Sequence, residues 1–189
     1  MIELSEKTKQ LLQDLNKFSS ETYFHALRVK SLTLLMINHI NENVEKKFSH
    51  KEIDYICKGA LLHDIGKLFV KNVVLTKKSS LSVQEKNAIE CHTVKGYEAI
   101  KDELTEEECK IVSEICLYHH DRIDGKGENG LTVIPFYVQI VSICDAYDAL
   151  VSDRIYREAL SKELAVEMIE SGKCGAFSKQ LISYLKAII

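Results

Sequence analysis

The scarcity of residues that break helices is the feature that most constrains the fold of this chain. Proline occurs once and glycine 8 times among 189 residues, whereas a β architecture that depends on tight turns needs many of both. Apolar residues instead recur three and four positions apart, as they do on one face of a helix. The sequence therefore predicts an all-α fold with no strand.

Capping residues indicate where the helices begin. Ser49 and Glu52 have the spacing of a capping box, and the same spacing recurs at Ser82. Pro135 fits the first turn of a nearly all-apolar helix. We expect a loop with little regular structure over residues 66–80. Helices are expected over about 3–17, 21–40, 49–64, 82–90, 92–101, 105–119, 134–151, 161–171 and 178–188.

Composition and charge exclude several classes of protein. Hydrophobic residues make up 46 %, charged residues 28 %, and the formal net charge is -3, so we expect no direct binding to nucleic acid or to anionic membranes. No stretch reaches the length of a membrane span, and the charged N-terminal segment does not resemble a signal peptide. The cysteines form no C-x-x-C pair. We expect a cytoplasmic protein with one domain over residues 1–189.

A His-Asp pair stands at the end of an apolar run. His63 and Asp64 follow this run, and Lys67 comes four residues after His63. A buried imidazole and carboxylate are costly without a cation or a partner, and together they form a nitrogen-plus-oxygen metal clamp. Asp145 would also need a cation or a partner, because it lies in an almost wholly apolar segment. Considered alone, His63 and Asp64 have an alternative interpretation as an ordinary pair of surface residues without a metal.

Other histidines and acids lie beside apolar segments that would carry them inward. Glu21 and His25, four residues apart, share one helix face. Each residue has an ordinary alternative: His92, for instance, could simply begin a helix, and Asp145 could bond a backbone amide. The candidate ligands, which are named at the end of this paragraph, number eight. This is more than one ion needs, and it suits two or three metal ions that share carboxylates. The candidate metal ligands are Glu21, His25, His63, Asp64, His92, His119, His120 and Asp145.

Three basic side chains accompany the candidate ligands. Lys67, Arg154 and Arg157 carry charges that suit the phosphate oxygens of a small anionic ligand. The alternative interpretation of the two arginines is that they are solvated surface residues that bind no ligand. The two remaining histidines, His39 and His50, receive no metal role, because they lie at a helix end and in a capping box.

The order of these residues resembles an HD-GYP domain, a subgroup of the HD superfamily of metal-dependent phosphohydrolases. The resemblance covers about residues 18–185 and depends on three elements. They are the run His63-Asp64-Ile65-Gly66-Lys67, the pair His119-His120 followed by Asp124-Gly125, and the segment from Asp145 to Arg157.

The resemblance implies an HD-domain helical bundle with five core helices around the metals and further peripheral helices. It implies hydrolysis of cyclic di-GMP, or a related cyclic dinucleotide, to pGpG or GMP by a metal-activated hydroxide. It also implies two metals, or three when an extra Glu is present as Glu21 is here, often iron or manganese; zinc, cobalt or nickel would also suit such ligands. Asp64 and Lys67 are then the expected catalytic residues, and Lys67, Arg154 and Arg157 the expected substrate-binding residues.

The chain departs from the family at the loop that gives the subgroup its name. Gly127-Glu128-Asn129 stands where the family has Gly-Tyr-Pro. In the family this loop is linked to contacts with cyclase domains, and the altered loop argues against such contacts here. Independently of the loop, a separate regulatory or cyclase protein is the partner that we expect. The altered loop motivates one alternative, a phosphohydrolase for another nucleotide or phosphate ester. A further alternative is a nucleotide-binding or signalling module without turnover, although relatives of that kind usually lose metal ligands that this chain keeps. Metal analysis would distinguish the last of these.

Overall fold

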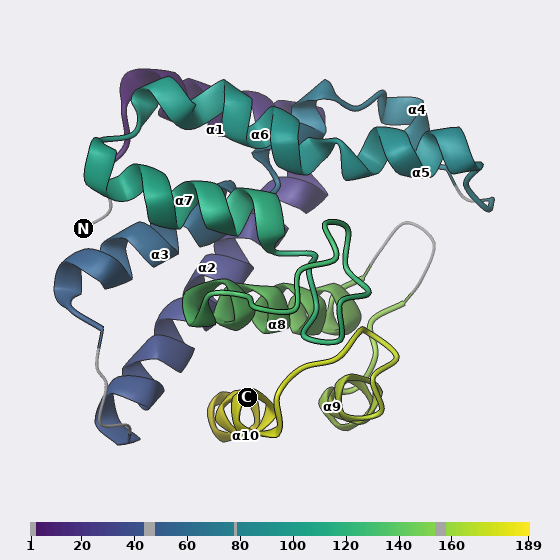
Figure 1. Ribbon diagram of the computed structural model, residues 1–189. Helices are drawn as coiled ribbons and strands as arrows, with labels where there is room; N and C mark the ends of the chain where they lie inside the picture. Colours follow the sequence, from purple (N-terminus) through teal and green to yellow (C-terminus); the bar gives the residue numbers. More distant parts are fainter. Residues whose placement is uncertain (1–2, 44–47, 78, 154–157) are drawn as a thin grey trace.

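The computed structural model describes residues 3–43, 48–77, 79–153 and 158–189, and all regular structure within these ranges is helical (Figure 1). The predicted all-α fold is confirmed. The helices are α1 Glu6–Phe18, α2 Ser20–Asn43, α3 His50–Leu62, η1 Ile65–Phe69, α4 Asn72–Leu75, α5 Val83–Glu90, α6 His92–Ile100, η2 Lys101–Glu103, α7 Glu106–Tyr118, α8 Phe136–Val151, α9 Lys162–Glu170 and α10 Lys179–Ile188, where η denotes a 3-10 helix.

The predicted capping signals begin the helices. The Ser49 hydroxyl accepts a hydrogen bond from the backbone N–H of Glu52, whose side chain accepts one in return from the Ser49 backbone, and the boxes that open α5 and α7 are complete in the same way. Each box satisfies two N–H groups that a helix start leaves without an intrahelical partner. Helix α8 begins at Phe136, two residues later than the expected start at residue 134, and Pro135 is its N-cap.

The prediction of a loop with little regular structure over residues 66–80 was wrong. This segment contains most of η1 and the single turn α4. The backbone of Gly66 lies against α6, where a Cβ atom on Gly66 would come within 1.9 Å of the His92 carbonyl oxygen. This close approach holds the chain in 3-10 turns. Such turns are too short to produce a helical periodicity in the sequence.

Two apolar cores hold the helices together. The larger one surrounds α8, where Ile140, Val141 and Ile143 are fully buried, and it joins α2, α3, α9 and α10. The second includes Leu62 and Ile100 and joins α1, α3, η1, α6 and α7. Helices α9 and α10 lie on the far side of α8 from α1 and α6 (Figure 1). Among the described helices, none has the combination of length and apolar character that crossing a bilayer requires.

Candidate metal centre

Five helices bring the predicted histidines and aspartates to one place. His25 lies on α2, His63 and Asp64 follow α3, His92 begins α6, His119 and His120 follow α7, and Asp145 lies on α8. The helices that carry these side chains pack in the two apolar cores, so the packing of the cores fixes the positions of the side chains relative to one another. The residues exposed by 1 % or less are His25, His63, Asp64, His92 and His119.

The first group of converging ligand atoms comprises His25, His63 and Asp145. The Nε2 atom of His25 lies 2.9 Å from Oδ1 of Asp145, and Nε2 of His63 lies 3.8 Å from the same oxygen. One ligand atom from each residue lies within 4.8 Å of the others. Two imidazoles and one carboxylate therefore surround a common point.

Asp64 lies at the middle of the cluster. Its Oδ2 atom is 3.5 Å from Nε2 of His63 and 3.8 Å from Nε2 of His25. Its other oxygen, Oδ1, is 3.2 Å from Nε2 of His92. Together with His119, His63 and Asp64 form a second group whose ligand atoms lie within 4.8 Å of one another. The carboxylate of Asp64 thus has histidines on both sides.

The third group consists of His92, His119 and His120. The Nε2 atoms of His92 and His119 face each other at 3.4 Å. The Nδ1 atom of His92 lies 2.6 Å from the carbonyl oxygen of Ile89, and Nδ1 of His119 lies 3.1 Å from two backbone carbonyls of α7. A neutral ring that donates its Nδ1–H to a carbonyl has its lone pair on Nε2, so both lone pairs point into the cluster.

Two buried atoms test whether this cluster fits a metal. Within the described residues, Nε2 of His63 and Oδ1 of Asp64 are buried and have no hydrogen-bond partner. Most buried polar atoms in proteins do have one. A cation between these atoms would satisfy both, and it would remove the repulsion between the facing lone pairs of His92 and His119. The residues present therefore fit metal ions.

Burial and neighbouring charges put four members of the cluster, His63, Asp64, His119 and His120, in their metal-binding protonation states. Burial and the neighbouring histidines hold the pKa of His119 well below its usual range, and burial lowers the pKa of His63 and lowers that of His120 to about 3. Burial acts to raise the pKa of Asp64, but Lys67 and His63 outweigh it and hold that pKa well below its usual range. Neutral imidazoles and ionised carboxylates are the forms that bind metals.

Asp148 and Arg28 support His25 from behind. Oδ2 of Asp148 lies 2.7 Å from Nδ1 of His25, and Arg28 donates to both oxygens of Asp148, at 2.7 and 3.0 Å. Burial lowers the pKa of His25, but Asp145 and Asp148 outweigh it and raise this pKa to about 8. From the sequence, Asp148 is expected to need a partner, because it lies one turn after Asp145 in the same apolar segment, but no metal role is expected for it. Arg28 was missed, because nothing in its surroundings in the sequence distinguishes it.

The other predicted residues lie at the margin of the cluster or outside the described ranges. Nζ of Lys67 lies 2.6 Å from Oδ2 of Asp64, and its side chain is 19 % exposed, so the ammonium stands between the cluster and solvent. Glu21 is half-buried on α2 one turn before His25, and the three groups found among the described residues do not include it. Arg154 and Arg157 lie outside the described residues.

The loop after α7 packs back on the cluster. The buried carboxylate of Asp121 accepts hydrogen bonds from the backbone and the side-chain amide of Asn129, both at 2.9 Å. A Cβ atom on Gly127 would lie 2.3 Å from Cα of Asp121. Between these two points Glu128 extends to within 4.0 Å of His120, measured from Oε1 to Nε2. Burial raises the pKa of Glu128 to about 7.

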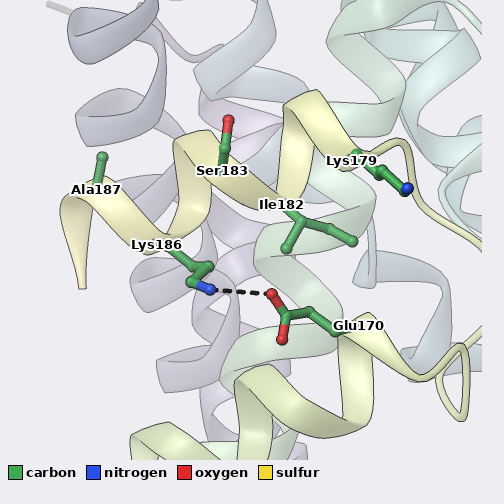
Figure 2. A pocket seen from close by; sticks show the side chains of 6 residues that line it. All are labelled: Glu170, Lys179, Ile182, Ser183, Lys186 and Ala187. Carbon is green, nitrogen blue, oxygen red and sulfur yellow. Dashed lines mark hydrogen bonds and ion pairs between the residues drawn. The ribbon is translucent and has the colours of Figure 1, made fainter.

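A pocket on the opposite side of α8 has a different character. It has a volume of about 670 Å³ and is lined by residues of α9 and α10, including Ile182 and Ser183. Figure 2 shows Lys186 and Glu170 pointing toward each other across it, with 3.0 Å between the charged atoms. The pocket contains none of the three ligand groups found in the described residues. We therefore place the functional site at the histidine cluster.

Comparison with known families agrees with this placement. The model of the HD domain matches residues 22–150, a range that contains every residue of the three ligand groups. The chain belongs to the HD domain family. The resemblance to this superfamily that the sequence motifs suggested is confirmed. HD domains are metal-dependent, and the ligand groups give this chain the residues to bind metal.

Relatives of this HD domain include proteins named as phosphodiesterases for cyclic dinucleotides. The cyclic di-GMP phosphodiesterase response regulator RpfG of Xanthomonas campestris pv. campestris is 32 % identical over 140 residues, which are 72 % of this chain and 37 % of that protein. The 3'3'-cGAMP-specific phosphodiesterase 2 of Vibrio cholerae is 30 % identical over 98 % of this chain and 35 % of its own length. The chain spans less than half the length of these curated relatives.

A solved structure shares the fold. Bd1817, an HDG"Y"P protein from Bdellovibrio bacteriovorus, superposes with a TM-score of 0.68 at 22 % identity over 88 % of this chain and 51 % of that one. At this level of identity the likeness shows the arrangement of helices alone. It agrees with the predicted HD-domain bundle.

Proposed function

We propose that this chain is a metal-dependent phosphodiesterase that hydrolyses a cyclic dinucleotide, with cyclic di-GMP as the first candidate and pGpG or GMP as product. The observation that carries this proposal is the convergence of five histidines and two aspartates from five helices on one buried cluster. The names of the relatives support it, because those relatives are phosphodiesterases for cyclic di-GMP and 3'3'-cGAMP.

The three ligand groups would hold two or three divalent ions. His25, His63 and Asp145 would hold one, His92, His119 and His120 another, and Asp64 would bridge between ions. Glu21 is proposed as a further ligand, beside His25 on α2. Imidazole with carboxylate suits iron and manganese, which we favour, and is also compatible with zinc, cobalt and nickel. Bound ions lower the pKa of water and neutralise phosphate charge.

The chain's own residues bind and orient the substrate. The half-buried ammonium of Lys67 stands between Asp64 and solvent, where a non-bridging phosphate oxygen would meet it. Arg154 and Arg157 are proposed to bind phosphate as well, because a guanidinium offers two parallel donors to phosphate oxygens. Asp148 holds His25 so that its Nε2 atom faces the ions.

The test is hydrolysis by the purified chain. Protein prepared without oxygen and loaded with Mn²⁺ or Fe²⁺ is incubated with cyclic di-GMP, 3'3'-cGAMP or cyclic di-AMP, and the products are separated by chromatography. We expect a linear dinucleotide or mononucleotide from wild type and none from Asp64→Asn. Metal-loaded wild type that cleaves no cyclic dinucleotide would overturn the proposal. Elemental analysis of the same samples counts and names the ions.

The altered loop favours a second candidate, a phosphohydrolase for another nucleotide or phosphate ester. Glu128 stands where the subgroup has tyrosine and faces His120, so the site differs from the family pattern next to a ligand group. Including mononucleotides and simple phosphodiesters in the same assay distinguishes the two. A signalling module without turnover would bind a nucleotide and leave all of these substrates intact. A cytoplasmic location and a separate regulatory or cyclase partner remain predictions.

A further inference from the structure

The carboxylate of Glu128 faces a group of ligands that are all neutral. Its Oε1 atom lies 4.0 Å from Nε2 of His120, and His120 forms the third ligand group with His92 and His119. Two donor atoms that bind one ion at about 2.1 Å each lie at most about 4.2 Å apart. The observed separation therefore allows Glu128 and His120 to bind the same ion.

The backbone on both sides of Glu128 is fixed to the end of α7. Asn129 donates two hydrogen bonds to Asp121 and a third to the carbonyl oxygen of Leu117, at 3.1 Å. Gly127 packs so closely on Asp121 that no side chain would fit there. The side chain of Glu128, which is 23 % exposed, is thus held beside the cluster. It accepts no hydrogen bond from another described residue.

The charge of a bound metal ion favours a carboxylate beside His92, His119 and His120. The other two ligand groups each contain an aspartate, whereas His92, His119 and His120 supply only imidazoles. The ion held by these three neutral ligands would share the carboxylate of Asp64 with a neighbouring ion, so a further carboxylate would cancel charge that otherwise stays in a buried site. An oxygen donor beside imidazoles also suits manganese and iron.

We propose that Glu128 is a carboxylate ligand of the ion held by His92, His119 and His120. This proposal rests on the proposed metal centre and deepens it. The chain would thus use an acidic residue, at the loop position where the resembled subgroup has tyrosine, to complete one of its metal sites. The consequence is a site that retains its ion more strongly than the three histidines alone would.

The experiment measures metal binding without reference to turnover. Full-length wild type and Glu128→Gln are stripped with a chelator and titrated with Mn²⁺, and free Mn²⁺ is followed by electron paramagnetic resonance. The Co²⁺-loaded forms are compared by visible absorption, which reports the ligands of the ion. Glu90→Gln is the matched control, because Glu90 is exposed at the end of α5 and this variant makes the same chemical change near the cluster. Circular dichroism verifies that each variant is folded.

If Glu128 is a ligand, the affinity of one class of Mn²⁺ sites should fall about tenfold or more in Glu128→Gln, a loss of the size seen when groups that support metal ligands are removed. The Co²⁺ spectrum should change as well, while Glu90→Gln behaves as wild type. Unchanged affinity and spectrum in Glu128→Gln would overturn the proposal, as would an equal loss in Glu90→Gln, which would indicate a general charge effect. Glu128-dependent metal binding without cleavage of any cyclic dinucleotide would instead overturn the proposed function and support this inference.

Discussion

Oδ2 of Asp148 lies 2.7 Å from Nδ1 of His25, and the other nitrogen of the same ring, Nε2, lies 2.9 Å from Asp145. Asp148 is 2 % exposed and is itself held by two hydrogen bonds from Arg28. A carboxylate behind a histidine fixes the proton on Nδ1 and leaves the Nε2 lone pair for a metal. Asp148 is therefore a positioning residue, since it acts on the metal centre through His25.

Asp148→Asn should weaken metal binding while it leaves the ligands in place. The amide can present its NH₂ group to His25 and carries no charge to hold the ring, so we expect the affinity for Mn²⁺ to fall by about 10- to 100-fold. Titration of chelator-treated protein measures the change. Asp102→Asn, at an exposed aspartate in η2, is the control and should bind as wild type. Equal affinity in Asp148→Asn and wild type would contradict the positioning role.

Asp64→Asn should abolish both the metal response and turnover. The Oδ1 atom of Asp64 is buried without a hydrogen-bond partner among the described residues, and Oδ2 approaches His63 and His25, so one substitution affects more than one ligand group. At metal concentrations 100 times Kd, binding stabilises wild type by about 2.7 kcal/mol. This raises Tm by roughly 5–10 °C for a chain of this size. Differential scanning fluorimetry with and without Mn²⁺ should show that rise in wild type alone; turnover that persists in the variant would refute the metal mechanism.

Gly66→Ala should separate α6 from the cluster. A Cβ atom on Gly66 would lie 1.9 Å from the His92 carbonyl oxygen and 2.5 Å from the backbone nitrogen of Gly96. Backbone atoms cannot yield as a flexible side chain can, so we expect a loss of about 1–3 kcal/mol in the free energy of unfolding together with weaker metal binding through displaced His92. Urea unfolding and Mn²⁺ titration provide the two measurements.

Gly172→Ala provides the comparison for that prediction. Gly172 has a φ of 74°, and a Cβ atom on this residue would meet no other atom within 4 Å. Alanine there therefore costs about 1–2 kcal/mol of local strain and leaves the cluster untouched. We expect lower stability with normal metal affinity. If both variants lose metal to the same extent, the effect of Gly66→Ala comes from stability alone.

The sequence predicted the helices because their signals are local. Capping residues and apolar spacing act within a few positions, and the nine predicted helices correspond to α1–α3 and α5–α10. The 3-10 turns around Gly66 escaped prediction because they depend on contact with α6, which is remote in the sequence. Nothing local reveals such a contact.

The site was predictable where a charged or imidazole group interrupts an apolar segment. Asp64 and Asp145 could be recognised in this way, and the structure brings them together with the predicted histidines. Arg28 and Glu128 could not, because an arginine on a helix and a glutamate in a loop are ordinary surface residues until the fold places one on Asp148 and the other beside His120. The metal-binding, catalytic and substrate-binding roles of all the predicted residues stay predictions.

Acid should destabilise the chelator-treated protein below about pH 6.5. Burial lowers the pKa of His63 from the ordinary 6.5, and lowers that of His119 further. As the pH falls through 6.5, these imidazoles therefore bind protons in the unfolded chain but not in the folded chain. The free energy of unfolding declines as a result. His25 has the opposite sign: its raised pKa of about 8 adds stability that is complete below 6.5 and is lost as the pH rises through 8. The carboxyl group of Glu128, whose pKa is raised to about 7, adds stability as the pH falls, but the three imidazoles with lowered pKa values, His63, His119 and His120, outweigh it. Stability should therefore be greatest near neutral pH and fall toward pH 5. Urea unfolding in chelator at pH 7 and pH 5 measures this difference, which His119→Gln should reduce; an equal free energy of unfolding at both pH values in wild type would show that these imidazoles are not held neutral by the fold.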